Sequence, residues 1–296
     1  MNLTTLVSQI LINGILFGTM YGIAAIGLSL IFGTMRIIFL AQGTVIVFLS
    51  YICWVFFTSL GIDPYLSLAI IVPLAIALGI GFYYGMFRNA AASGDENVSL
   101  LIAVGLMYLL ENIMTVVWGP SAHTVLMSYR GVVFHPFGLV VRLTAIIALV
   151  LAILATIIVW LFLKRTRIGT AVRAAAEDMV STTLLGINPN WVNAVAFAIG
   201  IGMTGVAGVS FATVYSFDPL FGFTFSLKAL IALTLGGVGN IFGALAGGIT
   251  LGVIESFSSY YLGSGWTEGV SFAVFLLVLA FMPQGLFGAR GNVKKA

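Results

Sequence analysis

The chain has 296 residues, of which 61% are hydrophobic and only 7% are charged. Soluble domains carry about 25% charged residues, so this composition excludes a water-exposed fold and predicts an all-α polytopic membrane protein. The single cysteine excludes a disulfide framework, and the two histidines lack metal-ligand spacing. The net charge of +3 is spread over segment ends, which does not fit the basic patch of a nucleic-acid-binding surface.

A helix needs about 20 apolar residues to cross the hydrocarbon core of a membrane. By that measure we expect about eight transmembrane segments in a single transmembrane domain, residues 1–296. In chain order the apolar segments are Leu6–Phe32, Ile37–Leu60, Tyr65–Phe87, Val98–Trp118, Leu143–Leu163, Trp191–Tyr215, the Gly-rich stretch Leu227–Phe257, and Gly269–Phe287.

Basic residues in the short loops predict the orientation, because cytoplasmic loops carry an excess of Lys and Arg. If the first five segments all cross, Arg36, Arg88 and the basic cluster 164–173 face the cytoplasm, and the N-terminus faces outward. The basic tail 290–295 then also belongs inside. One straight crossing by 227–257 would put that tail outside. We therefore expect a broken or re-entrant path through 227–257, or two short spans.

Glycines recur every four residues in two places, and this spacing leaves one helix face free for a close backbone approach. The glycines predicted to pack helices in this way are Gly14, Gly18, Gly22, Gly239, Gly243 and Gly247. In addition, the run 236–240 predicts an interruption of the helix at membrane depth, which is tolerated only inside protein or beside a wet cavity.

Polar side chains inside apolar segments are candidates for the route of a solute, since such groups are costly in lipid. Glu111 lies about two-thirds of the way along the fourth segment, either as a neutral or paired carboxyl or as a functional group. Lys228 and Glu255 are expected near the interface, with side chains that reach the headgroups. The residues assigned to the substrate pathway are Asn13, Tyr21, Gln42, Glu111 and Asn240.

The loop 164–190 contains a short Ala-rich segment between two stop signals. Residues 170–185 predict one helix, Gly186 suits its C-terminal turn, and Asn188 with Pro189 suits the start of the next helix. This helix is too short to span the membrane and apolar on one side. We expect it to dock on the membrane surface or on a cytosolic partner.

Several blocks of sequence resemble the permease subunits of branched-chain amino acid importers of the ABC class. Arg173-Ala-Ala-Ala-Glu177-Asp178 followed by Leu184-Leu-Gly186-Ile187 resembles the EAA-type coupling loop of such permeases. The supporting blocks are 21–33, 166–173, 235–244 and 282–288, in the family's order and spacing.

The resemblance implies that Arg173, Ala175, Ala176, Glu177, Asp178 and Gly186 contact an ATPase. It further implies a second permease subunit, the same chain or a related one. Two cytosolic ATP-binding subunits, a periplasmic solute-binding protein and a place in the lipid of the bacterial inner membrane complete the expected system. The sequence contains no P-loop, so ATP is expected on the partner subunits, with no cofactor and no enzymatic activity on this chain.

One block departs from the family pattern. Where the family usually has Asn and His after Arg36, this chain has Phe39 and Gln42, which leaves the identity of the solute open. Branched-chain or other amino acids are the family's default. The alternative function is an autonomous channel or an ion-coupled secondary transporter for a small polar solute such as urea, an amide or an organic acid, with Glu111 carrying the ion coupling. A membrane-embedded enzyme ranks third.

Overall fold

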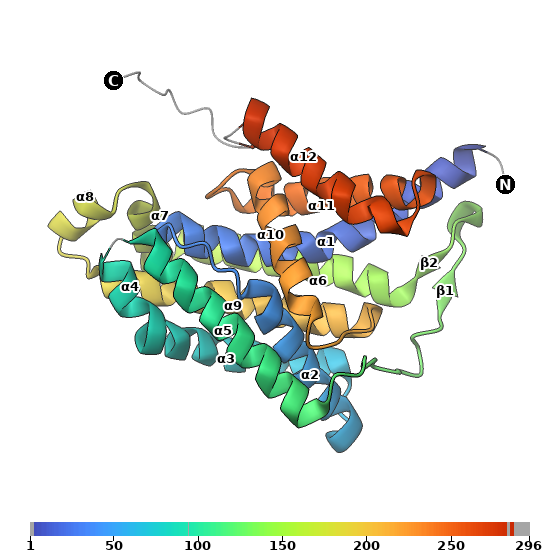
Figure 1. The fold of residues 1–296 in the computed structure, drawn as a ribbon, viewed down its shortest axis with the longest axis horizontal. Helices are drawn as coiled ribbons and strands as arrows, with labels where there is room; N and C mark the ends of the chain where they lie inside the picture. Colours follow the sequence, from blue (N-terminus) through green and yellow to red (C-terminus); the bar gives the residue numbers. More distant parts are fainter. Residues whose placement is uncertain (1–2, 94, 283–284, 287–296) are drawn as a thin grey trace.

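The computed structural model describes residues 3–93, 95–282 and 285–286, and Figure 1 shows its helices in one bundle. Its long helices are α1 (Leu3–Met35), α2 (Gln42–Leu60), α3 (Pro64–Phe82), α5 (Glu96–Trp118), α6 (Leu143–Arg165), α9 (Pro189–Val214), α11 (Ile241–Tyr261) and α12 (Thr267–Phe281). The shorter elements are α4 (Arg88–Ser93), α7 (Arg167–Glu177), α8 (Met179–Leu184), α10 (Phe221–Gly236), β1 (Val133–Phe134) and β2 (Val141–Arg142).

Eight helical segments in the described chain are long and apolar enough to cross a membrane, which confirms the predicted fold class. Figure 1 shows the N-terminus and the β1–β2 hairpin at one end of the bundle and α7 and α8 at the other. The hairpin lies in the loop expected to face outward, and α7 and α8 lie in the loop expected to face the cytoplasm. We therefore call these the outer end and the cytoplasmic end.

Two of the long helices, α1 and α9, form the centre of the bundle, because most of their apolar residues are buried. They cross at Gly27 and Gly200, where a Cβ atom on Gly27 would lie 2.6 Å from the carbonyl oxygen of Gly200. Around this crossing, α11 packs along α1 and α3 packs along α9. If α1–α3 and α9–α11 are taken as two groups of three helices, the third helix of each group packs on the first helix of the other group.

Both central helices are followed by six residues of non-helical chain, 36–41 after α1 and 215–220 after α9. Each segment leads into a helix that begins inside the protein, α2 at Gln42 and α10 at Phe221. The starts of these helices touch so closely that a side chain on Gly43 would overlap the carbonyl oxygen of Gly222. Ser226 closes the contact, since its hydroxyl donates to Leu40 O at 2.6 Å and accepts from Gly43 N at 2.8 Å.

The second apolar segment was predicted to be helical from Ile37, and this start is wrong by five residues. Residues Ile37 and Phe39 are buried in non-helical chain. Unpaired backbone groups at membrane depth must lie inside protein, and the apolar side chains of this segment keep it there.

The predicted interruption at 236–240 is confirmed. Helix α10 ends at Gly236, and Gly237 and Gly239 adopt positive φ values of 84° and 81°. Asn240 then caps α11 by accepting a hydrogen bond from Gly243 N at 3.0 Å. The Gly-rich stretch 227–257 therefore forms two helices, the end of α10 and most of α11, joined by a turn.

The glycines of α1 lie against α11, with Gly14 beside Val253, Gly18 beside Ile249 and Gly22 beside Leu245. On the other face of α11, Gly243 and Gly247 lie against α10. The prediction that Gly239 belongs to such a helix face is wrong, because Gly239 lies in the turn before α11 and nothing packs where its side chain would be.

We expect Gly248→Ala to destabilise the bundle, because its methyl group would overlap the backbone of Gly22 and lie 2.8 Å from the carbonyl oxygen of Gly18. Overpacking of this kind costs about 1–3 kcal/mol. The measurement is thermal unfolding in detergent. Gly105→Ala is the matched control, since Gly105 has open space around it. Equal melting temperatures for the two variants would contradict the close packing of α1 on α11.

Candidate functional site: a polar cavity with a buried ion pair

An ion pair joins α10 and α11 inside the membrane-spanning region. Lys228 Nζ lies 3.0 Å from Glu255 Oε1 and 3.1 Å from Oε2. The glutamate is only 7% exposed. Because a charge without a partner is costly at membrane depth, each of these side chains supplies the counter-charge of the other.

Two hydroxyl groups complete the coordination of the carboxylate. Tyr21 of α1 donates to Oε2 of Glu255 at 2.8 Å, and Ser271 of α12 donates to Oε1 at 2.9 Å. The carboxylate therefore receives donors from α1, α10 and α12 while it sits on α11. The ammonium of Lys228 also lies 5.2 Å from the centre of the Tyr21 ring, within the range of a cation–π contact.

The expectation that Lys228 and Glu255 reach the headgroups is wrong. It rested on their positions in the sequence, at the start and near the end of the Gly-rich stretch 227–257. Because α10 begins inside the protein and turns back into α11, the two side chains are brought together at one depth. The signal in the sequence was that both residues are ionisable and lie in an apolar stretch.

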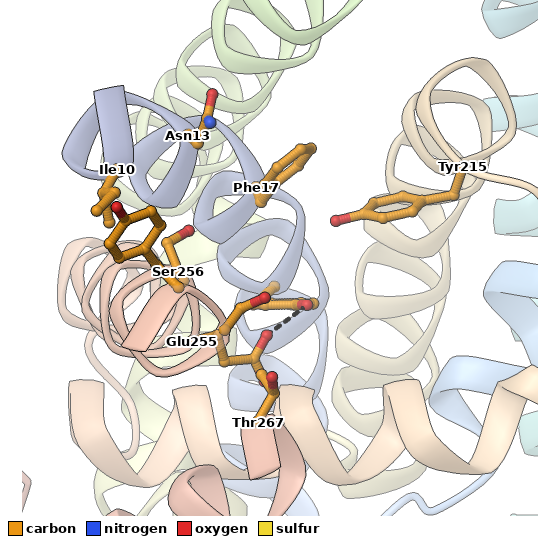
Figure 2. Close-up of a pocket in the computed structure, with 11 residues that line it drawn as sticks. Ile10, Asn13, Phe17, Tyr215, Glu255, Ser256 and Thr267 are labelled. Carbon is orange, nitrogen blue, oxygen red and sulfur yellow. Dashed lines mark hydrogen bonds between the residues drawn. The ribbon is translucent and has the colours of Figure 1, made fainter. Parts of the chain in front are cut away.

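A cavity of about 440 Å³ adjoins this carboxylate. Figure 2 shows Asn13 and Phe17 of α1 on one side, the Tyr215 ring reaching in from the end of α9, and Thr267 at the start of α12. The side chains and backbone that line it are Ile10, Asn13, Phe17, Tyr21, Tyr215, Gly252, Glu255, Ser256, Ser259, Tyr260 and Thr267. The lining mixes hydroxyl and amide groups with apolar surface, which suits a small amphiphilic solute.

The five residues assigned to the substrate pathway do not gather at one place. Asn13 and Tyr21 line the cavity. Gln42 is fully buried and donates to Ala24 O at 3.2 Å, so it holds the start of α2 against α1. Glu111 is buried on α5, and Asn240 caps α11 nearer the cytoplasmic end.

Several residues of the cavity were not predicted from the sequence. They are Tyr215, Ser256, Ser259, Tyr260 and Thr267, together with Ser271, which donates to Glu255. Lys228 and Glu255 were noted in the sequence as ionisable groups but were expected at the interface. Hydroxyl side chains are common in membrane helices, so their residue types gave no signal. Within the described residues, no cluster of three metal-ligating side chains occurs.

The cytoplasmic end presents two short helices instead of the single helix predicted for 170–185. That prediction is wrong because Asp178 breaks the helix and caps α8, accepting hydrogen bonds from the backbone of Val180 and Ser181. The side-chain hydrogen bond from Ser181 is the main reason why the pKa of Asp178 lies below its usual value. Gly186 ends this region with a φ of 83°.

The two short helices differ in what they touch. Val172 and Ala175 on α7 are buried against the bundle, and Ala176 lies near Gly33 of α1. Arg173 donates from Nε to Leu163 O at 2.9 Å, which fixes α7 to the end of α6. In contrast, α8 exposes its apolar residues Val180 and Leu184, and Leu185 directly after it is exposed as well.

A bundle of membrane-spanning helices with an internal polar cavity has the architecture of a membrane transport protein. The chain matches the family model for the branched-chain amino acid transport system / permease component over residues 10–279. It is 33% identical over 299 residues to the high-affinity branched-chain amino acid transport system permease protein LivH of Escherichia coli (strain K12), covering 97% of each chain. The chain therefore belongs to this family of permease components.

Other relatives agree. The permease protein BraD of the high-affinity branched-chain amino acid transport system of Pseudomonas aeruginosa is also 33% identical, over 97% of each chain. The probable branched-chain amino acid transport permease protein LivH of Methanocaldococcus jannaschii is 26% identical over 95% of this chain and 92% of its own length. No solved structure matches the chain.

We expect Glu255→Gln to destabilise the protein by about 3–5 kcal/mol, because it leaves the ammonium of Lys228 buried without a counter-charge. The double variant Lys228→Met with Glu255→Gln should recover most of that loss, since it removes both charges. The measurement is thermal unfolding of the single and double variants, with the exposed Glu268→Gln as control. A double variant less stable than Glu255→Gln would show that the two charges are not coupled.

Proposed function

We propose that this chain is one of two permease subunits that together form the translocation pathway of an ABC importer in a bacterial inner membrane. The relatives' names indicate a branched-chain or related amino acid as the solute. Because the sequence contains no P-loop, the ATP is bound and hydrolysed by two separate cytosolic subunits. A periplasmic solute-binding protein delivers the solute to the outer end.

The exposed apolar face of α8 is the observation that carries the coupling part of this proposal. Leu184 is 84% exposed at the cytoplasmic end. A short helix that presents such side chains to water needs a protein surface to cover them. The neighbouring α7 contacts the end of α1, so a displacement of α8 by an ATPase passes to the central helix of the bundle.

The second permease subunit is proposed to pack on the face formed by α5, α10 and α12. Helix α10 contacts both of its neighbours, and Figure 1 shows the three helices crossing the same side of the bundle. This side exposes polar groups at membrane depth, among them Tyr108 and Asn112 of α5. A polar, broken surface of this kind fits a protein partner or a wet pathway better than lipid.

The polar cavity, which adjoins this face at Thr267 of α12, is proposed to contact the solute. Its lining carries hydroxyl groups beside a carboxylate whose charge is cancelled by Lys228. The absence of a net charge from this pair suits a solute that is itself neutral or zwitterionic. The apolar side chains of Ile10 and Phe17 provide surface for an aliphatic side chain.

We expect Leu184→Asp to abolish uptake and to lower co-purification of the ATPase at least about tenfold, since it places a charge in a desolvated contact. The measurement is a pull-down of the tagged chain together with solute uptake in cells. Leu126→Asp is the matched control, because Leu126 is a similarly exposed leucine in the outward-facing loop. Normal ATPase recovery with Leu184→Asp would exclude α8 as the docking element.

We expect a cysteine at position 112, in Asn112→Cys, to crosslink to the partner permease in native membranes, because this face is proposed to be the subunit interface. Ile158→Cys is the control, since Ile158 is exposed on α6, away from this face. The endogenous Cys53 is buried and does not interfere. Crosslinking through Ile158→Cys but not through Asn112→Cys would place the interface on the opposite side of the bundle.

A further inference from the structure

A second cavity, of about 570 Å³, lies at the cytoplasmic end of the bundle. It is enclosed by the ends of α1 and α6, by α7, and by the turn between α10 and α11. The lining residues are Ser29, Leu30, Gly33, Thr34, Trp160, Leu163, Lys164, Val172, Arg173, Ala176, Glu177, Val238, Gly239, Asn240, Ile241 and Phe242. Arg173, Ala176 and Glu177, which the family resemblance assigns to an ATPase contact, are among them, but the coupling proposed above rests on α8 and gives the cavity itself no role.

Three charged side chains line the cavity, the cations Lys164 and Arg173 and the anion Glu177. No salt bridge joins them to one another in the described part of the chain. The bond from Arg173 Nε to Leu163 O holds the guanidinium in place and leaves its two terminal nitrogens without a hydrogen-bond partner among the described residues. The cavity therefore offers two positive groups and one negative group to a ligand.

The remaining walls of the cavity are apolar and aromatic. Lys164 Nζ lies 4.6 Å from the ring centre of Trp160, and this ring lies 5.8 Å from that of Phe242 on α11. The two aromatic rings stand at the level where Lys164 and Arg165 end α6, which is the headgroup level of the membrane. Phe242 is 48% exposed, so the apolar side of the cavity opens outward between α6 and α11.

We propose that this cavity binds a phospholipid with a zwitterionic phosphoethanolamine headgroup. The phosphate accepts hydrogen bonds from Lys164 and Arg173, and the primary ammonium donates to Glu177. One acyl chain passes Trp160 and Phe242 into the hydrocarbon core. The lipid thereby joins α7, which leads to the docking helix α8, to the turn that precedes α11.

The pattern of charges selects this headgroup among phospholipids. A phosphatidylglycerol headgroup carries no cation, so Glu177 would face it without a partner. A phosphatidylcholine headgroup has a quaternary ammonium without N–H donors, so it cannot donate to Glu177. The apolar mouth at Phe242 favours a lipid over a soluble ion or zwitterion of the cytoplasm, because neither of these has a chain to place there.

The test is native mass spectrometry of the delipidated, detergent-purified protein in the assembly in which it purifies. It is titrated with phosphatidylethanolamine, phosphatidylglycerol and phosphatidylcholine of identical acyl chains. We expect phosphatidylethanolamine to be retained about fivefold more than either of the others, which corresponds to one added charge-assisted contact. Inorganic phosphate, phosphoethanolamine and leucine are added as soluble competitors, and none is expected to displace the lipid at equal concentration.

Three variants separate the contributions. Lys164→Gln should lower the retention of phosphatidylethanolamine and phosphatidylglycerol alike, about fivefold, because it removes one charge directed at the phosphate. Glu177→Gln should remove the preference for phosphatidylethanolamine over phosphatidylglycerol while leaving binding intact. Arg165→Gln is the matched control, a neighbouring basic residue that does not line the cavity, and should bind lipid like the unchanged protein.

Two results would overturn the proposal. Equal losses for Arg165→Gln and Lys164→Gln would show that the basic residues attract lipid without a defined site. Displacement of the lipid by phosphoethanolamine or leucine at equal concentration would assign the cavity to a soluble ligand. The comparison of Arg165→Gln with Lys164→Gln does not depend on which solute the permease carries, so a failure of the lipid site is distinguishable from a failure of the proposed transport function.

Discussion

The close approach of helix backbones at the centre of the bundle is the constraint on which the other features depend. Helix α1 meets α9 at Gly27 and Gly200, and it meets α11 through a row of glycines. This contact leaves room for two non-helical segments, 36–41 and 215–220, inside the protein. With larger side chains on α1 these segments would be pushed outward, where lipid cannot satisfy their backbone groups.

The ion pair and the cavity follow from this arrangement. Because α10 begins inside the bundle, Lys228 lies beside α1 and α11 and not at a membrane surface. The carboxylate of Glu255 then gathers donors from three other helices. A charged group that is satisfied only when four helices are in place makes the geometry of the cavity sensitive to any movement of α1 or α12.

The cytoplasmic end connects to the same central helix. Helix α7 packs on the bundle through Val172 and Ala175 and lies against the end of α1, while α8 projects into water. A partner that moves α8 therefore acts on α1, which also supplies Tyr21 and Asn13 to the polar cavity. Helix α1 is the physical link between the two ends.

The sequence by itself determined that the chain lies in lipid, that its fold is all-α and polytopic, that the helix breaks at 236–240 and which family the chain belongs to. These depend on composition, on runs of apolar residues and on local motifs. It did not determine the split at Asp178, since a capping carboxylate inside an Ala-rich helix is visible only once its hydrogen bonds are known. The position of Gly239 in a turn was likewise hidden by its regular spacing. Only the tertiary structure paired Lys228 with Glu255 and gathered the hydroxyl groups around the cavity. These contacts join residues far apart in the chain, and their geometry depends on how deep in the bundle each helix begins.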